Sequence, residues 1–319
     1  MEVVRKASVL LAFVLSACGG TVPGGTPPPA GGTGRFRLVV LGAAQDGGLP
    51  HLGCARACCE AARRDGRRID PTSLGVVDTK TGARLLVEAT PQVEAQVARL
   101  HRVAGLAQRP RRPVDAVILT HAHIGHYAGL VEFGREAAST DHLPVWVTER
   151  MATFLRNNGP WDLLVRLGQI ELRVVRDGEP FEPLPGLRVT PIVVPHRQEY
   201  SDTIALRLAG SERTVLFASD VDRWEDGLLE RLLDGVDVAY LDGTFRDGRE
   251  LPGRDLPEIP HPPIVTTVER LASRARARPG ALRFIHLNHT NPLWTDDALL
   301  QQLERAGFGV AEQEESFRF

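Results

Sequence analysis

The fold is decided by the stretch Val117-Ile118-Leu119-Thr120-His121-Ala122-His123-Ile124-Gly125-His126-Tyr127-Ala128-Gly129-Leu130, in which an apolar run ends in three histidines. Residues 114–119 are mostly apolar and include three β-branched residues, which predicts a buried strand that delivers the next side chains to the edge of a sheet. His121 and His123 can point the same way in an extended turn, and His126 follows where residues 127–133 predict a helix. Because neutral imidazole is a preferred zinc ligand, we interpret this stretch as a metal-binding turn. The alternative is a histidine-rich surface turn.

Composition limits the function classes. The chain has 319 residues and 43% hydrophobic content, which is enough for a buried core. Its formal net charge is -2, and the arginine-rich segments 109–112 and 274–278 are interpreted as solvated faces. We therefore expect no nucleic-acid partner.

The N-terminus has the pattern of an export signal. Two basic residues precede an apolar run at 7–15, and small residues follow at 16–19, as in a secretory signal peptide. The apolar run is too short to span a membrane as a helix. Leu15-Ser16-Ala17-Cys18 resembles the bacterial lipoprotein signal, which implies cleavage after residue 17 and acylation of Cys18. The alternative is a simple secretory signal that contains a cysteine. Residues 18–34 are rich in Gly, Pro and Thr and predict a flexible tether. We expect a periplasmic or cell-envelope protein that is lipid-anchored to a membrane.

Residues 35–319 are predicted to form one domain. Its short strands and helices do not follow strict βαβ alternation, which favours an α+β fold with sheets covered by helices on their outer faces. Strands are predicted at 36–41, 73–78, 83–88, 144–148, 170–175, 187–194, 203–208, 214–218, 237–241 and 282–287. Helices are predicted at 91–100, 132–138, 149–157, 227–233, 265–276 and 295–306.

Three further strand ends carry metal-type ligands. His196 follows Val193-Val194-Pro195, Asp220 follows Leu216-Phe217-Ala218-Ser219, and His286 follows Arg283-Phe284-Ile285. A lone His or Asp at such a position is more often structural than a ligand. Four strand ends with such residues in one chain favour a shared metal site.

With these residues the sequence resembles the metallo-β-lactamase superfamily over residues 35–294. The resemblance implies an αββα sandwich of two mixed sheets, with one or two active-site zinc ions, or manganese or iron in their place. It places His121, His123 and His196 around one metal, Asp220 as a bridging and catalytic carboxylate, and His126 with His286 at a second metal. One departure concerns Gly125, because the superfamily carries an acidic residue at that position. The second site is then weak, empty or completed by another carboxylate such as Asp222 or Asp242.

The cysteines predict a second, structural metal site. Cys54, Cys58 and Cys59 form an odd set of thiols, which favours metal ligation over complete pairing. Segments 47–54, 242–245 and 286–292 look like the pyrroloquinoline-quinone biosynthesis protein B branch and are similar to phosphonate-pathway cyclic phosphodiesterases. The likeness to these phosphodiesterases implies a structural zinc held by Cys54, Cys59 and His289, with Cys58 or His51 in place of the motif's middle cysteine, which is Arg56 here. A vicinal disulfide or free buried thiols are the alternatives.

A metal with open coordination lowers the pKa of bound water and supplies hydroxide for attack on a carbonyl or phosphoryl centre. We therefore predict a metal-dependent hydrolase that acts on a phosphodiester or a related small anionic ester. His261 is predicted to be the general acid, since similar phosphodiesterases bring a histidine from this region to the phosphate; the alternative is an exposed loop histidine. Arg197, Gln198 and Tyr200 are candidate substrate contacts; the alternative for Arg197 is an ion pair with Glu199. A quinone-cofactor-related iron oxygenase and a non-catalytic metal-binding lipoprotein are the competing hypotheses.

Overall fold

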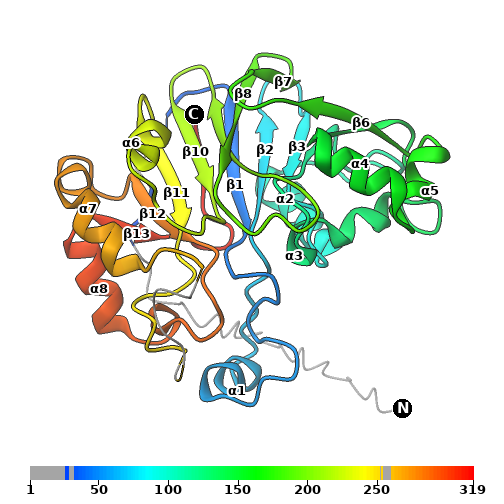
Figure 1. Cartoon of the computed structure of the whole chain (residues 1–319). Helices are drawn as coiled ribbons and strands as arrows, with labels where there is room; N and C mark the ends of the chain where they lie inside the picture. The colour runs from blue at the N-terminus through cyan, green and yellow to red at the C-terminus, as the bar shows by residue number, and fades with distance from the viewer. Residues whose placement is uncertain (1–25, 29–31, 252, 254–259) are drawn as a thin grey trace, which may run out of the picture.

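The computed structural model describes residues 26–28, 32–251, 253 and 260–319. Two seven-stranded sheets lie face to face, with helices on their outer faces (Figure 1). The predicted αββα sandwich is therefore confirmed. The predicted signal peptide at 1–17 lies outside the described residues, as does much of the predicted tether at 18–34. Within the described ranges, no helix is both long enough and apolar enough to cross a membrane.

The first sheet has the order β14-β1-β2-β3-β4-β5-β6. The pairs from β14 to β3 are antiparallel, and those from β3 to β6 are parallel. Its strands are β1 (Phe36–Gly42), β2 (Ser73–Asp78), β3 (Arg84–Val87), β4 (Ala116–Ile118), β5 (Leu143–Thr148), β6 (Ile170–Val175) and β14 (Ser316–Arg318).

The second sheet has the order β13-β12-β11-β10-β9-β8-β7 and the same division into halves. The pairs from β7 to β10 are antiparallel, and those from β10 to β13 are parallel. Its strands are β7 (Phe181–Leu184), β8 (Leu187–Val194), β9 (Thr203–Ala209), β10 (Thr214–Ala218), β11 (Val238–Asp242), β12 (Leu282–Ile285) and β13 (Phe308–Val310).

All the described helices except α1 (Ala57–Arg64) lie on the outer face of one sheet or the other. On the side of the first sheet lie α2 (Val93–Ala104), α3 (Ile124–Tyr127), α4 (Glu149–Asn157), α5 (Trp161–Arg166) and the 3-10 helix η1 (Ala128–Phe133). On the side of the second lie α6 (Leu228–Leu233), α7 (Ile264–Ala277) and α8 (Asp297–Arg305), with the 3-10 helix η3 (Pro292–Trp294) between β12 and α8. Helix α1 stands apart from both sheets on an extended segment (Figure 1).

Local sequence explains several of these boundaries. Thr148 precedes α4, and its side chain accepts a hydrogen bond from the backbone N–H of Met151, which satisfies one of the helix's free donors. Helix α2 ends at Gly105, which adopts the left-handed conformation with φ 67° that glycine enters without strain.

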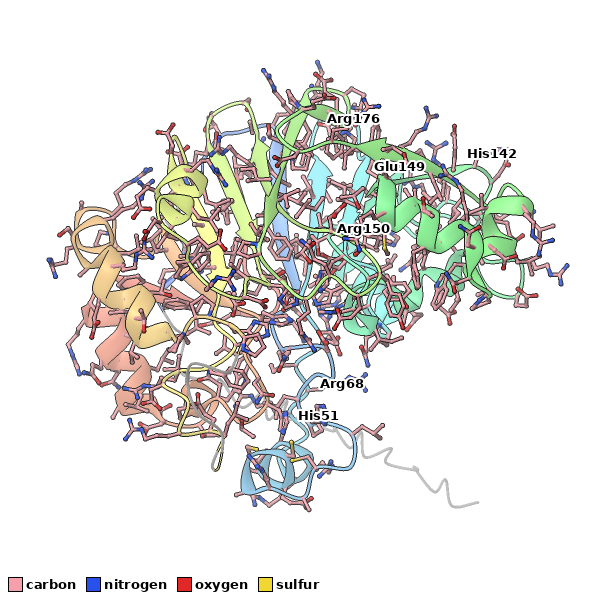
Figure 2. The ribbon with its side chains drawn as sticks, viewed as in Figure 1. His51, Arg68, His142, Glu149, Arg150 and Arg176 are labelled. Carbon is pink, nitrogen blue, oxygen red and sulfur yellow. The ribbon has the colours of Figure 1, made fainter. Side chains whose placement is uncertain are left out.

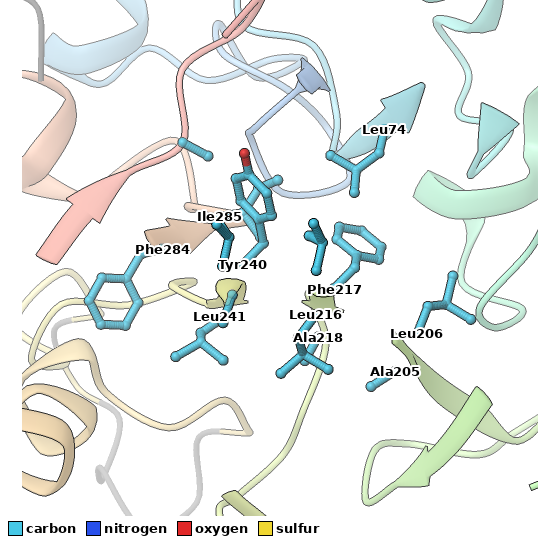
Figure 3. Close-up of a cluster of buried hydrophobic side chains, with 14 of the residues drawn as sticks. Leu74, Ala205, Leu206, Leu216, Phe217, Ala218, Tyr240, Leu241, Phe284 and Ile285 are labelled. Carbon is cyan, nitrogen blue, oxygen red and sulfur yellow. The ribbon is translucent and has the colours of Figure 1, made fainter. Parts of the chain in front are cut away.

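The main core lies between the two sheets. Leu74 from β2 packs in the same cluster as Leu206, Phe217 and Phe284 from the facing sheet (Figure 3). Each fully buried side chain of this size contributes roughly 2 kcal/mol relative to exposure. A second apolar cluster lies between the first sheet and its helices. Together these clusters hold the strand ends in place.

The structure corrects some predicted elements. The predicted helix at 132–138 is wrong, because η1 ends at Phe133 and Gly134 adopts an extended conformation with ψ 172°. The elements α1, α5, β7, β13 and β14 were not predicted. All five are short, so they contain too few residues to show a clear hydrophobic period.

Candidate metal centre

The candidate site lies where strands of both sheets end. The carboxyl ends of neighbouring parallel strands meet at one edge of a sheet, which brings together residues that are distant in sequence. These residues follow or end six strands: β1 (Asp46), β4 (His121, His123, His126), β8 (His196), β10 (Asp220), β11 (Asp242) and β12 (His286).

A first group contains His121, His123 and His196, whose ligand nitrogens lie within 4.8 Å of one another. The Nε2 atom of His196 is 3.0 Å from Nδ1 of His123. The ring of His121 lies 4.5 Å from that of His123 and 5.2 Å from that of His196, centroid to centroid. Three imidazoles from two loops therefore face one point.

The buried carboxylate of Asp220 lies between two groups of histidines. Its Oδ1 atom is 3.6 Å from Nε2 of His196 in the first group. Its Oδ2 atom is 3.2 Å from Nε2 of His126 and 3.2 Å from Nε2 of His286. One carboxylate thus offers one oxygen to each group.

Asp46 is a site residue that the sequence reasoning missed. Its Oδ1 atom lies 3.1 Å from Nε2 of His126 and 3.4 Å from Nε2 of His286. The other candidate ligands were found as His or Asp residues that follow an apolar strand. Asp46 follows strand β1 closely, so the same pattern could have identified it.

Asp222 and Asp242 do not lie beside His126 and His286, where the sequence offers them as substitutes for the carboxylate missing at Gly125. Oδ1 of Asp222 lies 2.7 Å from Nδ1 of His196, and Oδ2 of Asp242 lies 2.7 Å from Nδ1 of His261. Both carboxylates therefore orient imidazoles, a role that commonly supports metal-binding histidines.

Other side chains hold the site rigid. The hydroxyl oxygen of Thr244 donates to Oδ1 of Asp242 at 2.8 Å and lies 3.0 Å from Nδ1 of His286. Glu88, His261 and His286 have φ values of 71°, 84° and 66°, in the left-handed region that non-glycine residues rarely adopt. Such strained residues often cluster at functional sites and persist because their surroundings hold them.

The histidines are electrostatically unequal. Burial and then the neighbouring His126 hold the pKa of His121 well below its ordinary value, which keeps this imidazole neutral. Burial also opposes the charged form of His126, but Asp220 outweighs it and raises the pKa of His126 well above its ordinary value. For Asp220, burial raises the pKa, but His286 and His126 outweigh burial and lower it.

These residues fit a divalent metal. Among the residues that the structure describes, the buried Nε2 atom of His121 has no hydrogen-bond partner, although it lies amid other imidazoles. A buried polar atom without a partner is costly unless a ligand satisfies it. Neutral imidazole nitrogens and carboxylate oxygens are the ligand set of zinc and related ions.

His261 belongs to this site and is not an exposed loop residue. Its side chain is buried, and its ring lies 5.4 Å from that of His196 and 5.9 Å from that of His286. Burial alone lowers the pKa of His261, but Asp242 and then Asp220 outweigh it and raise the pKa to about 9. In the metal-free chain the His261 imidazole is therefore protonated at neutral pH, which is the form that a general acid requires.

The predicted substrate contacts lie at the rim. Arg197, Gln198 and Tyr200 are exposed, and the ring of Tyr200 lies 5.1 Å from that of Phe154 on α4. Arg150, which Figure 2 labels, lies at the start of α4 and donates to the backbone oxygen of Gln198 at 3.0 Å. A basic residue of the first sheet's helices thus meets the loop that carries His196.

The second cluster brings together Cys54, Cys59 and His289, whose ligand atoms lie within 4.8 Å of one another. The backbone N–H of His51 donates to the sulfur of Cys59 at 3.2 Å, and the ring of His51 stacks on that of His289 at 4.5 Å (Figure 2). Cys58 is half-buried on α1 beside Cys59 and lies outside this trio of ligand atoms.

Cys54, Cys58 and Cys59 are all free thiols, so the described residues contain no vicinal disulfide between residues 58 and 59. Burial raises the pKa of the Cys59 thiol to about 11, with further contributions from Cys54 and Cys58. A cation at this point would favour the thiolate instead, as expected for a structural zinc site.

Comparisons with known proteins agree with this architecture. The family described as beta-lactamase superfamily domain matches residues 83–287, more than half of the chain. Coenzyme PQQ synthesis protein B of Methylobacterium radiotolerans is 27% identical over 86% of this chain and 97% of its own length. The same-named protein of Ruegeria pomeroyi is 28% identical over 298 residues, which cover 86% of this chain and 97% of its own length.

Two solved structures share the fold. The zinc-bound PqqB from Methylobacterium extorquens has a TM-score of 0.74 and 22% identity, and covers 89% of this chain and 100% of that one. A diphosphatase from the PhnP family has a TM-score of 0.64 and 24% identity, and covers 89% of this chain and 97% of that one. From its family match, its paired sheets and the histidines at its strand ends, the chain belongs to the metallo-β-lactamase superfamily.

Proposed function

We propose that this protein is a metal-dependent hydrolase that acts on a phosphodiester or a related small anionic ester. The observation that carries the proposal is Asp220, whose two oxygens face separate histidine groups. A carboxylate in that position suits a pair of adjacent cations. Such a pair supplies a nucleophile at neutral pH and stabilises both the attacking and the leaving oxygen.

The residues of the chain have distinct roles in this proposal. His121, His123 and His196 would hold one ion, His126 and His286 would hold the second, and Asp220 would offer one oxygen to each. Asp222 fixes the ring of His196, and Thr244 fixes that of His286. This support keeps the ligands oriented before substrate arrives.

This hydrolysis requires water as the only co-substrate and no oxidant. The oxygen of a water molecule forms a new bond to phosphorus and releases a proton to the solvent, and the bond between phosphorus and the leaving-group oxygen breaks. His261, held by Asp242 through Nδ1, donates a proton from its other ring nitrogen to the leaving oxygen. General acid catalysis of this kind contributes typically about 100- to 10,000-fold.

The substrate class rests on the rim and on the relatives. Arg197 is exposed on the loop of His196, where its guanidinium can donate hydrogen bonds to an anionic group, while Arg150 beside it is paired with Asp202 at 3.2 Å. The PhnP-family neighbour is described as a diphosphatase, which is consistent with phosphoryl chemistry on this fold.

The test is turnover of bis-p-nitrophenyl phosphate by protein reloaded with zinc or manganese. His121→Ala is expected to lower the rate by at least about 100-fold, since even a partner outside the ligand shell is worth about 10- to 100-fold. The matched control is His142→Ala, because His142 is an exposed histidine far from the site and should leave turnover unchanged (Figure 2).

Circular dichroism of the metal-free proteins should show the same fold for both variants. Full turnover by His121→Ala would refute the site assignment. Equal losses in both histidine variants would show a general effect on the protein and would also count against it.

A second function is favoured by the similarity to coenzyme PQQ synthesis protein B, which extends over 86% of the chain. On this alternative the centre binds iron and takes part in an oxidation. Oxygen consumption by the iron-loaded protein, without phosphodiester turnover, would support this alternative over hydrolysis.

We also propose that the protein is anchored at the cell envelope through an acylated Cys18. The support is the sequence pattern at 1–18 alone. Mass spectrometry of the mature N-terminus from isolated membranes should find a diacylated or triacylated cysteine. An unmodified N-terminus in the soluble periplasmic fraction would refute the anchor.

A further inference from the structure

We propose that Asp46 supplies, from the loop after β1, the carboxylate ligand that the histidine turn lacks at Gly125. This inference deepens the proposed function and rests on its metal centre. It assigns the second ion four protein ligands: Asp46, His126, Asp220 and His286.

The first argument is the space at Gly125. A Cβ atom built on Gly125 would lie 2.5 Å from Cα of Asp46, 2.6 Å from its Cβ and 2.6 Å from its Oδ1. Real Cβ atoms do not approach other heavy atoms so closely. The Asp46 carboxylate therefore occupies the volume that a side chain of residue 125 would fill, so a glycine there and an aspartate at 46 go together.

The second argument is the way the backbone holds Asp46. Ala44 forms a bridge with Leu287, and the N–H of Gln45 donates to the oxygen of Leu287 at 2.9 Å. The N–H of Leu287 in turn donates to the oxygen of Ala43 at 3.1 Å. The loop after β1 is thus paired with the segment that carries His286, and Asp46 is placed beside that histidine by main-chain contacts.

The third argument is the donor set. Oδ1 of Asp46 lies 3.1 Å from Nε2 of His126 and 3.4 Å from Nε2 of His286, and Oδ2 of Asp220 lies 3.2 Å from each of these nitrogens. Two nitrogens and two oxygens from four strand ends therefore converge. Zinc and related divalent ions accept this ligand type and number.

The charges also balance better with Asp46 than without it. The two carboxylates together carry the charge opposite to that of one divalent ion. Without Asp46, the second ion would have only two neutral imidazoles and an Asp220 that it shares with the first ion. Like charges held close together are costly in a buried site, so the additional carboxylate favours occupancy by two ions.

A simpler role for Asp46 is an ion pair with a protonated His126. The variant Asp46→Asn separates the two roles, because it keeps the size and a hydrogen-bonding oxygen but removes the charge that a metal ligand needs. Glu199→Gln is the matched control. It removes a carboxylate 3.2 Å from Nε2 of His123 in the first group and leaves the Asp46 group intact.

The experiment is zinc titration of chelator-treated protein by calorimetry, with elemental analysis after dialysis. Asp46→Asn is expected to retain one ion fewer per chain than the wild type and to bind that ion at least about tenfold more weakly. Glu199→Gln weakens at most the ion of the first group, so it should bind the ion of the Asp46 group with wild-type affinity. Circular dichroism of each metal-free variant checks that the fold is unchanged.

Wild-type zinc content and affinity in Asp46→Asn would overturn the inference. Loss of the same ion from Glu199→Gln would also overturn it, because the effect would then be one of charge and not of ligation. A wild type that binds the expected ions but hydrolyses no ester would refute the proposed function and leave the Asp46 assignment standing.

Discussion

Replacing Glu315 by Gln is expected to destabilise the fold by about 3–5 kcal/mol, because it leaves a buried arginine without its counter-charge. The guanidinium of Arg283 on β12 donates to Oε1 of Glu315 at 3.0 Å and to Oε2 at 2.5 Å. The hydroxyl of Tyr240 donates to the same carboxylate at 2.6 Å. Side-chain exposure is 1% for Arg283 and 7% for Glu315.

The magnitude follows from this burial. Arg283 has another acceptor in the backbone oxygen of Val310 at 2.7 Å, so the loss concerns the charge more than the number of hydrogen bonds. Glu315 lies between β13 of the second sheet and β14 of the first, so the ion pair supports the crossover that joins the sheets. We expect the midpoint of thermal unfolding to fall by roughly 5–10 °C.

Glu314 is the matched control, one residue earlier. It pairs with Arg102 at 2.5 Å, but the two side chains are 41% and 62% exposed. Glu314→Gln should therefore cost at most about 1 kcal/mol. The assay is urea denaturation followed by far-UV circular dichroism, with all proteins metal-free. A Glu315→Gln loss no larger than that of Glu314→Gln would refute the reasoning from burial.

Three further outcomes are expected. Gly125→Ala should lower the free energy of unfolding of the metal-free protein by about 1–3 kcal/mol, because its Cβ would collide with Asp46; an unchanged urea midpoint would contradict this. Cys59→Ala should cost about 3 kcal/mol when free zinc exceeds its Kd 100-fold, and the difference should shrink with a chelator; an equal difference in both conditions would argue against a structural zinc. The hydrogen bond from Arg35 holds the pKa of Asp78 below its ordinary value, so the ionised carboxylate stabilises the fold above about pH 4, and this contribution is lost as pH falls further. Asp78→Asn should therefore show a flatter loss of stability than the wild type between about pH 4 and pH 2, and parallel curves would count against the pair.

Much of the metal centre could be predicted because its signals are local. Each of His121, His196, Asp220 and His286 stands within a few residues of an apolar strand, and strand position alone sends such a residue to the sheet edge. The strands were predictable for the same reason, because alternating apolar and polar residues and β-branched side chains can be recognised within a few residues of sequence. The hydrophobic pattern failed to predict very short elements such as β14. It also predicted a helix that continues past Gly134, where the structure ends the helix.

Other features depended on contacts that no short pattern encodes. For His261 the sequence leaves two interpretations open, a general acid or an exposed loop histidine, and only the tertiary structure places its ring in the interior beside Asp242, which raises its pKa. The convergence of Cys54 and Cys59 with His289 depends on packing between segments more than 200 residues apart.

By itself, therefore, the sequence determined the strands and the residues that follow them, because short-range hydrophobic patterning specifies where strands end, and its resemblance to the metallo-β-lactamase superfamily implied the αββα arrangement. It could show that Gly125 lacks the expected carboxylate, but not what replaces it. Only the tertiary structure decided that Asp46 fills this space, since the pairing of the β1 loop with Leu287 brings together residues about 240 positions apart.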